Sequence, residues 1–153
     1  EFGKKAVVAQ VEYIDTRVID ESRDEIASRF ESELRGWKEH HATGVVVITQ
    51  GVGPDGHTCG MMPYPEDVDT FAELFEDPEV WVRGYDAGNK NEFAERITIT
   101  IPFLKDIIDY SVLYMGGEEK RNAFDAILQE GSVAARPSRI ITQMKNVTLY
   151  TDL

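Results

Sequence analysis

The sequence has little cysteine, little positive charge and no long apolar run. Cys59 is the only cysteine among 153 residues. One thiol cannot form an intramolecular disulfide, so the sequence predicts a reducing setting, the cytoplasm or another intracellular compartment. No apolar stretch approaches the ~20 residues that cross a bilayer, and the first residues lack the apolar core of a secretory signal. We therefore expect no association with a membrane.

The shortage of positive charge narrows the choice of partner. The chain has 16 Lys and Arg against 28 Asp and Glu, a formal net charge of −12. Such a field repels the phosphates of nucleic acid, so direct nucleic-acid binding is not expected. An acidic surface instead favours a basic protein partner, or it mimics nucleic acid and inhibits a DNA-binding protein.

The chain also lacks repeats, low-complexity segments and shifts in composition. Glu1 and Phe2 are the residues that an EcoRI restriction site encodes, and we interpret them as a cloning remnant. The remaining residues, 3–153, are expected to form a single domain, because this length buries a sizeable core.

The apolar pattern alternates with period two in some segments and follows a helical period in others. Alternation predicts strands over residues 6–14 and 96–101, the second with Ile97, Ile99 and Ile101 on its buried face. Four segments have the spacing of amphipathic helices, namely 22–41, 66–75, 103–115 and 118–129. An extended stretch is expected over residues 140–151. The mixture predicts an α+β fold, with a mostly antiparallel or mixed β-sheet and amphipathic helices packed on one face.

Residues 43–62, TGVVVITQGVGPDGHTCGMM, combine glycine with reactive side chains. The β-branched run at 45–48 predicts a buried strand. The pair Asp55-Gly56 predicts a hairpin turn, after which the chain returns along that strand. In one hypothesis the protein is a small enzyme or ligand-binding domain that uses this tip. His57 is then a base, and Cys59 is a nucleophile or lines the pocket.

No metal and no cofactor is expected at this tip. His57 and Cys59 supply only two ligands, and His40 and His41 lie beyond the far end of the predicted strand. The glycine-rich turn lacks the lysine of a P-loop and the following helix of a dinucleotide-binding fingerprint.

An acidic segment follows the glycine-rich turn. Seven acids occur within the fourteen residues 66–79, interleaved with apolar and aromatic side chains. This pattern favours a docking surface in which carboxylates steer a basic partner and aromatic side chains anchor it. The residues expected to contact the partner are Glu66, Asp69, Phe71, Glu73, Phe75, Glu76, Glu79 and Trp81.

From these features we expect a non-enzymatic protein–protein interaction or assembly module. Its partner is a basic protein surface or a second copy of the chain. The enzyme that uses His57 and Cys59 and the acidic mimic of nucleic acid are the alternatives.

Overall fold

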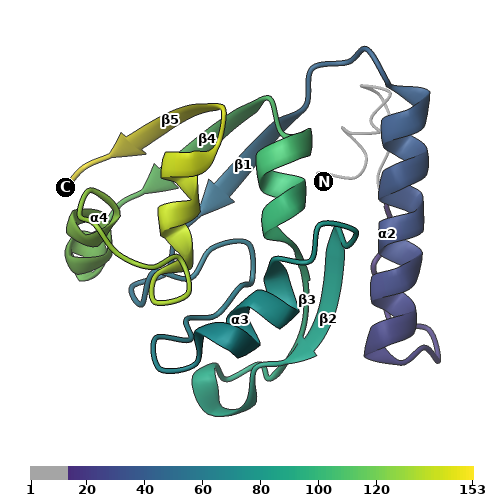
Figure 1. Ribbon diagram of the computed structural model, residues 1–153, viewed down its shortest axis with the longest axis horizontal. Coiled ribbons are helices and arrows are strands. Elements are labelled where there is room, and N and C mark those ends of the chain that lie inside the picture. Colours follow the sequence, from purple (N-terminus) through teal and green to yellow (C-terminus); the bar gives the residue numbers. More distant parts are fainter. Residues whose placement is uncertain (1–13) are drawn as a thin grey trace.

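The computed structural model describes residues 14–153. The strand predicted over residues 6–14 lies outside the described residues except for Ile14, as do Glu1 and Phe2. The described residues form a single α/β domain (Figure 1). Its α-helices are α2 (Arg23–His40), α3 (Val68–Phe75) and α4 (Arg121–Ile127). Its strands are β1 (Val47–Gly51), β2 (Val82–Asp86), β3 (Glu95–Ile99), β4 (Tyr110–Met115) and β5 (Asn146–Thr151).

The main sheet is parallel, which corrects the prediction of a mostly antiparallel sheet. Its strand order is β1-β4-β5, and β4 pairs in parallel with both neighbours. The antiparallel pairing that does occur is confined to β2 and β3, which form a separate two-stranded sheet. Parallel neighbours need long crossovers between them, and local sequence patterns do not report which distant strands pair.

Helix α2 agrees with its prediction because its start is determined by local residues. The Ser22 hydroxyl accepts a hydrogen bond from the Glu25 amide (3.3 Å), and the Glu25 carboxylate accepts one from the Ser22 amide (2.8 Å). This reciprocal capping box satisfies backbone donors that a helix start leaves without partners. Helix α3 begins in a similar way, with the Asp67 carboxylate accepting from the Thr70 amide.

The predicted helix over 103–115 is wrong. Only Phe103–Ile107 is helical, as a single π-helical turn (η2), and the chain then enters β4. Within β4, Ser111, Leu113 and Met115 are buried whereas Tyr110 and Tyr114 are exposed. This alternation has the period of a strand, and the position of β4 between two parallel neighbours stabilises it.

The predicted hairpin between 45–50 and 57–62 is also wrong. β1 pairs with β4, and the returning segment makes only isolated bridges, Val52 with Thr58 and Thr58 with Met61. Met61 and Met62 are almost completely buried. Burial of these two side chains draws the returning segment into the core instead of along the edge of β1.

The buried face of β3 is the opposite of the predicted one at Ile97 and Ile99, whereas Ile101, which follows the strand, is buried as predicted. Thr98 and Thr100 are buried, at 2% and 1% exposure, whereas Ile97 and Ile99 are partly exposed. The two hydroxyls donate hydrogen bonds to the backbone carbonyls of Cys59 and Val80. Hydrogen bonding removes the cost of burying these hydroxyls, so the hydrophobic pattern alone misassigned the face.

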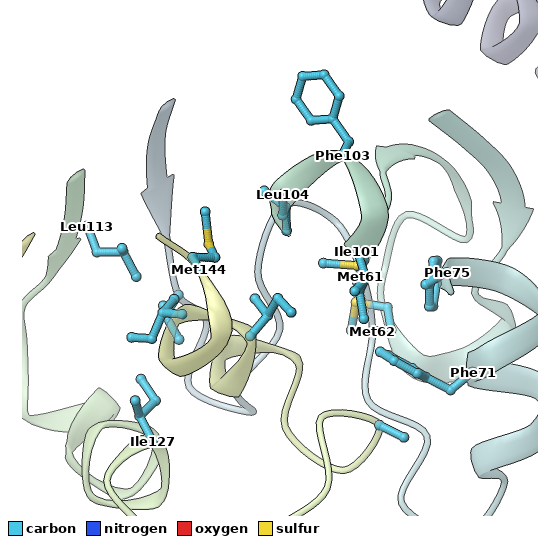
Figure 2. Close-up of a cluster of buried hydrophobic side chains, with 14 of the residues drawn as sticks. Met61, Met62, Phe71, Phe75, Ile101, Phe103, Leu104, Leu113, Ile127 and Met144 are labelled. Atoms are coloured by element: carbon cyan, nitrogen blue, oxygen red, sulfur yellow. The ribbon is translucent and has the colours of Figure 1, made fainter. Parts of the chain in front are cut away.

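The hydrophobic core lies between the parallel sheet and the β2–β3 unit. Figure 2 shows Met61, Met62 and Leu104 in the middle of it, with Phe71 and Phe75 of α3 on one side and Leu113, Ile127 and Met144 on the other. The opposite face of the parallel sheet is exposed, and Tyr114 lies there beside Tyr150 of β5. No helix in the described part of the chain is long and apolar enough to cross a bilayer.

Candidate active site

The turn that follows β1 carries the chemistry-bearing side chains. β1 ends at Gly51, at the carboxyl edge of the parallel sheet, where α/β proteins commonly bind ligands. The turn is closed by backbone hydrogen bonds from the Gly53 amide to the His57 carbonyl and from the Gly56 amide to the Gly53 carbonyl, each 2.9 Å. It therefore presents residues 54–57 as a compact loop beyond the strand.

Asp55 and His57 form a hydrogen-bonded pair within this turn. One carboxylate oxygen, Oδ1, accepts from the His57 amide (3.1 Å) and lies 2.7 Å from ring Nδ1. An ionised carboxylate can only accept, so neutral His57 carries its proton on Nδ1 and its lone pair on Nε2. Nε2 has no hydrogen-bond partner among the described residues, and the side chain is 28% exposed. This is the arrangement of a general base.

Gly53 gives the imidazole the room that it needs. A Cβ added at Gly53 would lie 2.2 Å from His57 Cε1 and 2.3 Å from Nδ1. Such distances are far below contact distance, so any side chain at this position displaces the ring. Glycine is therefore required at position 53 because the His57 ring lies so close to the backbone.

Side chains of β2 and β3 form hydrogen bonds with the backbone of residues 59–62, the segment that follows the turn. The Tyr85 hydroxyl donates to the Gly60 carbonyl (2.7 Å) and accepts from the Met62 amide (3.1 Å). Burial raises the pKa of Tyr85 to about 12, so the hydroxyl keeps its proton and its donor role at neutral pH. Thr98 binds the Cys59 carbonyl from the neighbouring strand. The site thus rests on buried, satisfied polar groups.

Cys59 is not arranged as a nucleophile. Burial raises the pKa of its thiol to about 11, whereas a reactive cysteine needs the thiolate near neutral pH. The thiol lies 3.2 Å from the Gln50 side-chain carbonyl and donates to it. Cys59 also has a positive φ of 55°. Its geometry therefore assigns it to packing beneath the turn.

The described residues contain no group of three or more His, Cys, Asp or Glu side chains that could hold a metal ion. His40 lies at the last residue of α2, where its Nδ1 is 2.6 Å from the Gly36 carbonyl. The structure thus places His40 in the closing turn of a helix rather than beside His57.

The structure wholly or partly buries the aromatic members of the predicted docking surface and exposes its carboxylates. Phe71 and Phe75 are completely buried in the core and cannot anchor a partner. Trp81 is partly buried, with the Arg35 guanidinium 4.2 Å from its ring centroid and Phe103 packed edge-on at 5.4 Å. The carboxylates of the segment are exposed, namely Glu66, Asp69, Glu73, Glu76 and Glu79.

Comparison with known sequences decides the family. The sequence profile described as glucosamine-6-phosphate isomerases/6-phosphogluconolactonase matches residues 3–150, nearly the whole chain. The chain belongs to this family. The expectation of a non-enzymatic docking module is therefore wrong, because the family is one of sugar-phosphate enzymes.

The chain is also similar to individual proteins, and the solved structures among them share its fold. A 6-phosphogluconolactonase from Mesorhizobium japonicum is 34% identical over 99 residues, which are 62% of this chain and 36% of that protein. The solved 6-phosphogluconolactonase of Thermotoga maritima is 23% identical, with a TM-score of 0.65 over 92% of this chain and 55% of that one. The enzyme from Trypanosoma brucei is 20% identical, with a TM-score of 0.64 over 94% and 56%.

The chain spans about half the length of these solved family members. Two surface grooves of the described residues are not lined by His57. An apolar groove of about 780 Å³ lies between α2 and β1 and is lined by Phe30, Trp37 and Val47. A polar groove of about 660 Å³ lies between α2 and β2, beside Arg23 and Arg83.

Proposed function

We propose that this protein hydrolyses the lactone of a phosphorylated sugar acid, as a 6-phosphogluconolactonase does. The observation that carries the proposal is the Asp55–His57 pair, which leaves Nε2 without a partner at the carboxyl edge of the parallel sheet. Family membership supports the substrate class, and the lactonases named above support hydrolysis.

The geometry suits the activation of water. Nε2 of His57 removes a proton from a water molecule while the water oxygen attacks the lactone carbonyl carbon. Asp55 stabilises the imidazolium that forms, because its carboxylate already binds Nδ1 at 2.7 Å. The tetrahedral intermediate then expels the ring oxygen, which takes a proton from Nε2 and becomes a hydroxyl group. The products are the open-chain hydroxy acid, which ionises at neutral pH, and the regenerated neutral histidine.

The conformation of the turn maintains this chemistry. Asp55 binds both the amide and the ring of His57, so the two residues cannot rotate independently. General acid–base catalysis of this kind contributes roughly 10²–10⁴-fold to a rate. A lactone is an activated ester, so the proposal requires no covalent intermediate and assigns no role to the Cys59 thiol.

A substrate comparison tests the proposal. Purified protein is supplied with 6-phosphogluconolactone, and acid release is followed in a pH-stat against the spontaneous rate. The same protein is supplied with glucosamine 6-phosphate, and ammonia release is measured. We expect acid release well above the spontaneous rate and no ammonia. Ammonia release without lactone hydrolysis would replace the proposal with the other activity that the family description contains.

A further inference from the structure

We propose that Arg136 is a positioning residue that holds the Asp55–His57 pair in its active geometry. The inference rests on the proposed function of His57. Arg136 lies 81 residues after Asp55, immediately before the 3-10 helix η4 (Pro137–Gln143), and its Nη1 donates to the Asp55 backbone carbonyl at 2.6 Å. A charged donor at this distance forms one of the stronger hydrogen bonds in proteins.

Residues 136–138 form hydrogen bonds with two successive carbonyls of the turn. Besides the bond to Asp55, the Ser138 amide donates to the Gly56 carbonyl at 2.9 Å. Gly56 has a φ of +86°, and a Cβ added there would lie 2.8 Å from Arg136 Cδ. The aliphatic part of Arg136 therefore packs directly on the turn while its guanidinium binds the carbonyl.

Arg136 is itself held in place. Its amide donates to the Val133 carbonyl (3.1 Å), and its carbonyl accepts from the Arg139 amide (2.9 Å). The following Pro137 and Ser138 are buried. The backbone that carries Arg136 is therefore held by its own hydrogen bonds and by burial of the two residues that follow, so the contact with the turn does not depend on the Arg136 side chain alone.

The charge of Arg136 has no carboxylate partner among the described residues. Most other arginines described here form ion pairs, for example Arg29 with Glu21 and Arg121 with Glu118. Arg136 instead directs its guanidinium at the peptide oxygen of the residue whose carboxylate binds His57. Fixing that peptide fixes the carboxylate, and the carboxylate determines which ring nitrogen carries the proton.

Arg139 provides a matched control. It lies on η4, the 3-10 helix that Arg136 precedes, and its guanidinium also donates to backbone carbonyls, those of Ala126 (3.0 Å) and Ser132 (3.1 Å). Neither carbonyl belongs to the turn. Replacing Arg139 therefore reproduces the loss of an arginine–carbonyl bond without touching the Asp55–His57 pair.

The test measures the imidazole directly. The chain contains three histidines, so nitrogen–proton correlation spectra of ¹⁵N-labelled protein can resolve the His57 tautomer. We expect wild-type protein and Arg139→Met to keep the proton on Nδ1. In Arg136→Met, which retains the packing but loses the donors, we expect a mixture of tautomers. Arg136→Lys keeps a charge and a donor, and it should restore much of the wild-type tautomer.

Turnover of 6-phosphogluconolactone provides the second measurement. We expect kcat of Arg136→Met to fall by roughly 10- to 100-fold, because small misplacements of catalytic groups are costly, with KM changed by less than about twofold. The tautomer distinguishes the two proposals, since it can be measured whether or not the protein is a lactonase. If Arg136→Met keeps the wild-type tautomer and kcat, the positioning role is overturned. Should Arg136→Met not fold, Arg136→Leu, which also lacks the donors that bind the Asp55 carbonyl, is judged by the same two measurements. An equal shift in Arg139→Met would overturn the positioning role as well.

Discussion

One oxygen of Asp55 holds His57 at two points, its backbone amide and its ring Nδ1. The two residues are separated by Gly56 alone, so this relationship is built into the turn. It determines the tautomer of the ring and directs Nε2 away from the backbone. Asp55 thus orients the ring, whereas His57 supplies the basic nitrogen, so a substitution at each residue tests a different contribution to catalysis.

Replacing Asp55 by Asn should impair catalysis without unfolding the protein. An amide can present either its oxygen or its nitrogen to Nδ1, so the tautomer is no longer specified. We expect kcat to fall by ~10²-fold or more, with KM little changed, in the lactone assay. Asp67→Asn removes a carboxylate that caps α3 and should leave kcat at the wild-type value. Equal activity of Asp55→Asn and wild type would refute the role of the pair.

Adding one methyl group at Gly53 should displace His57. The added carbon would lie 2.2 Å from the ring, whereas a methyl group at Gly51, two residues earlier, has nothing within 4 Å. We expect Gly53→Ala to lower kcat by ~10²-fold and Gly51→Ala to leave it unchanged. Both variants are measured with the same lactone assay, and folding is checked by thermal unfolding. Wild-type kcat in Gly53→Ala would show that the ring tolerates displacement.

Cys59 should contribute to the loss of stability at alkaline pH. Burial raises the pKa of the folded thiol from 9.0 to about 11, so the unfolded chain releases this proton at lower pH than the folded one. The stability that the neutral thiol contributes is complete below pH 9 and is lost as the pH rises to about 11. At pH 10 the loss should be about 1 kcal/mol, from one pKa unit.

Urea unfolding of wild type and Cys59→Ser at pH 8 and pH 10 measures this effect. The serine variant cannot ionise in this range, so its free energy of unfolding should fall less between the two pH values. If the free energy of unfolding falls equally in the two proteins between pH 8 and pH 10, burial does not raise the pKa of the Cys59 thiol.

The buried hydroxyl of Thr98 should stabilise the loop beneath the site. Thr98→Val has nearly the same shape but leaves the Cys59 carbonyl without its donor. An unsatisfied buried polar group costs about 1–3 kcal/mol, and we expect this loss in the free energy of unfolding. Ile97→Val on the partly exposed face should cost less than Thr98→Val. A larger loss of stability in Ile97→Val than in Thr98→Val would instead support the predicted orientation of β3, with Ile97 on the buried face.

The elements that the sequence predicted well are those determined by nearby residues. The Ser22–Glu25 capping box marks the start of α2, and Asp67 marks the start of α3. The failures involve distant partners. The helical spacing of Leu104, Ile107 and Ile108, which precede β4, wrongly predicts a helix that continues through this strand. The pairing of β4 with β1 and β5 spans tens of residues and leaves no local pattern.

The site could be predicted in part. Residue types alone point to the glycine-rich turn and, in one of the alternative hypotheses, to His57 as a base, and the catalytic role of His57 stays a prediction. The partnership with Asp55 could have been found from the i, i+2 spacing, because Asp side chains bind the amide two residues on. Arg136 could not, since it reaches the turn from 81 residues away. The acidic segment misled the functional interpretation because its aromatic side chains are buried.

The most direct test of the account is the turnover of 6-phosphogluconolactone by His57→Gln. Glutamine keeps a polar side chain but cannot take a proton from water, so kcat should fall by ~10²-fold or more while the thermal midpoint stays near that of wild type. His40→Gln changes a histidine at the end of α2 and should retain full activity. A folded His57→Gln variant that hydrolyses the lactone at the wild-type rate would contradict the assignment of His57 as the general base.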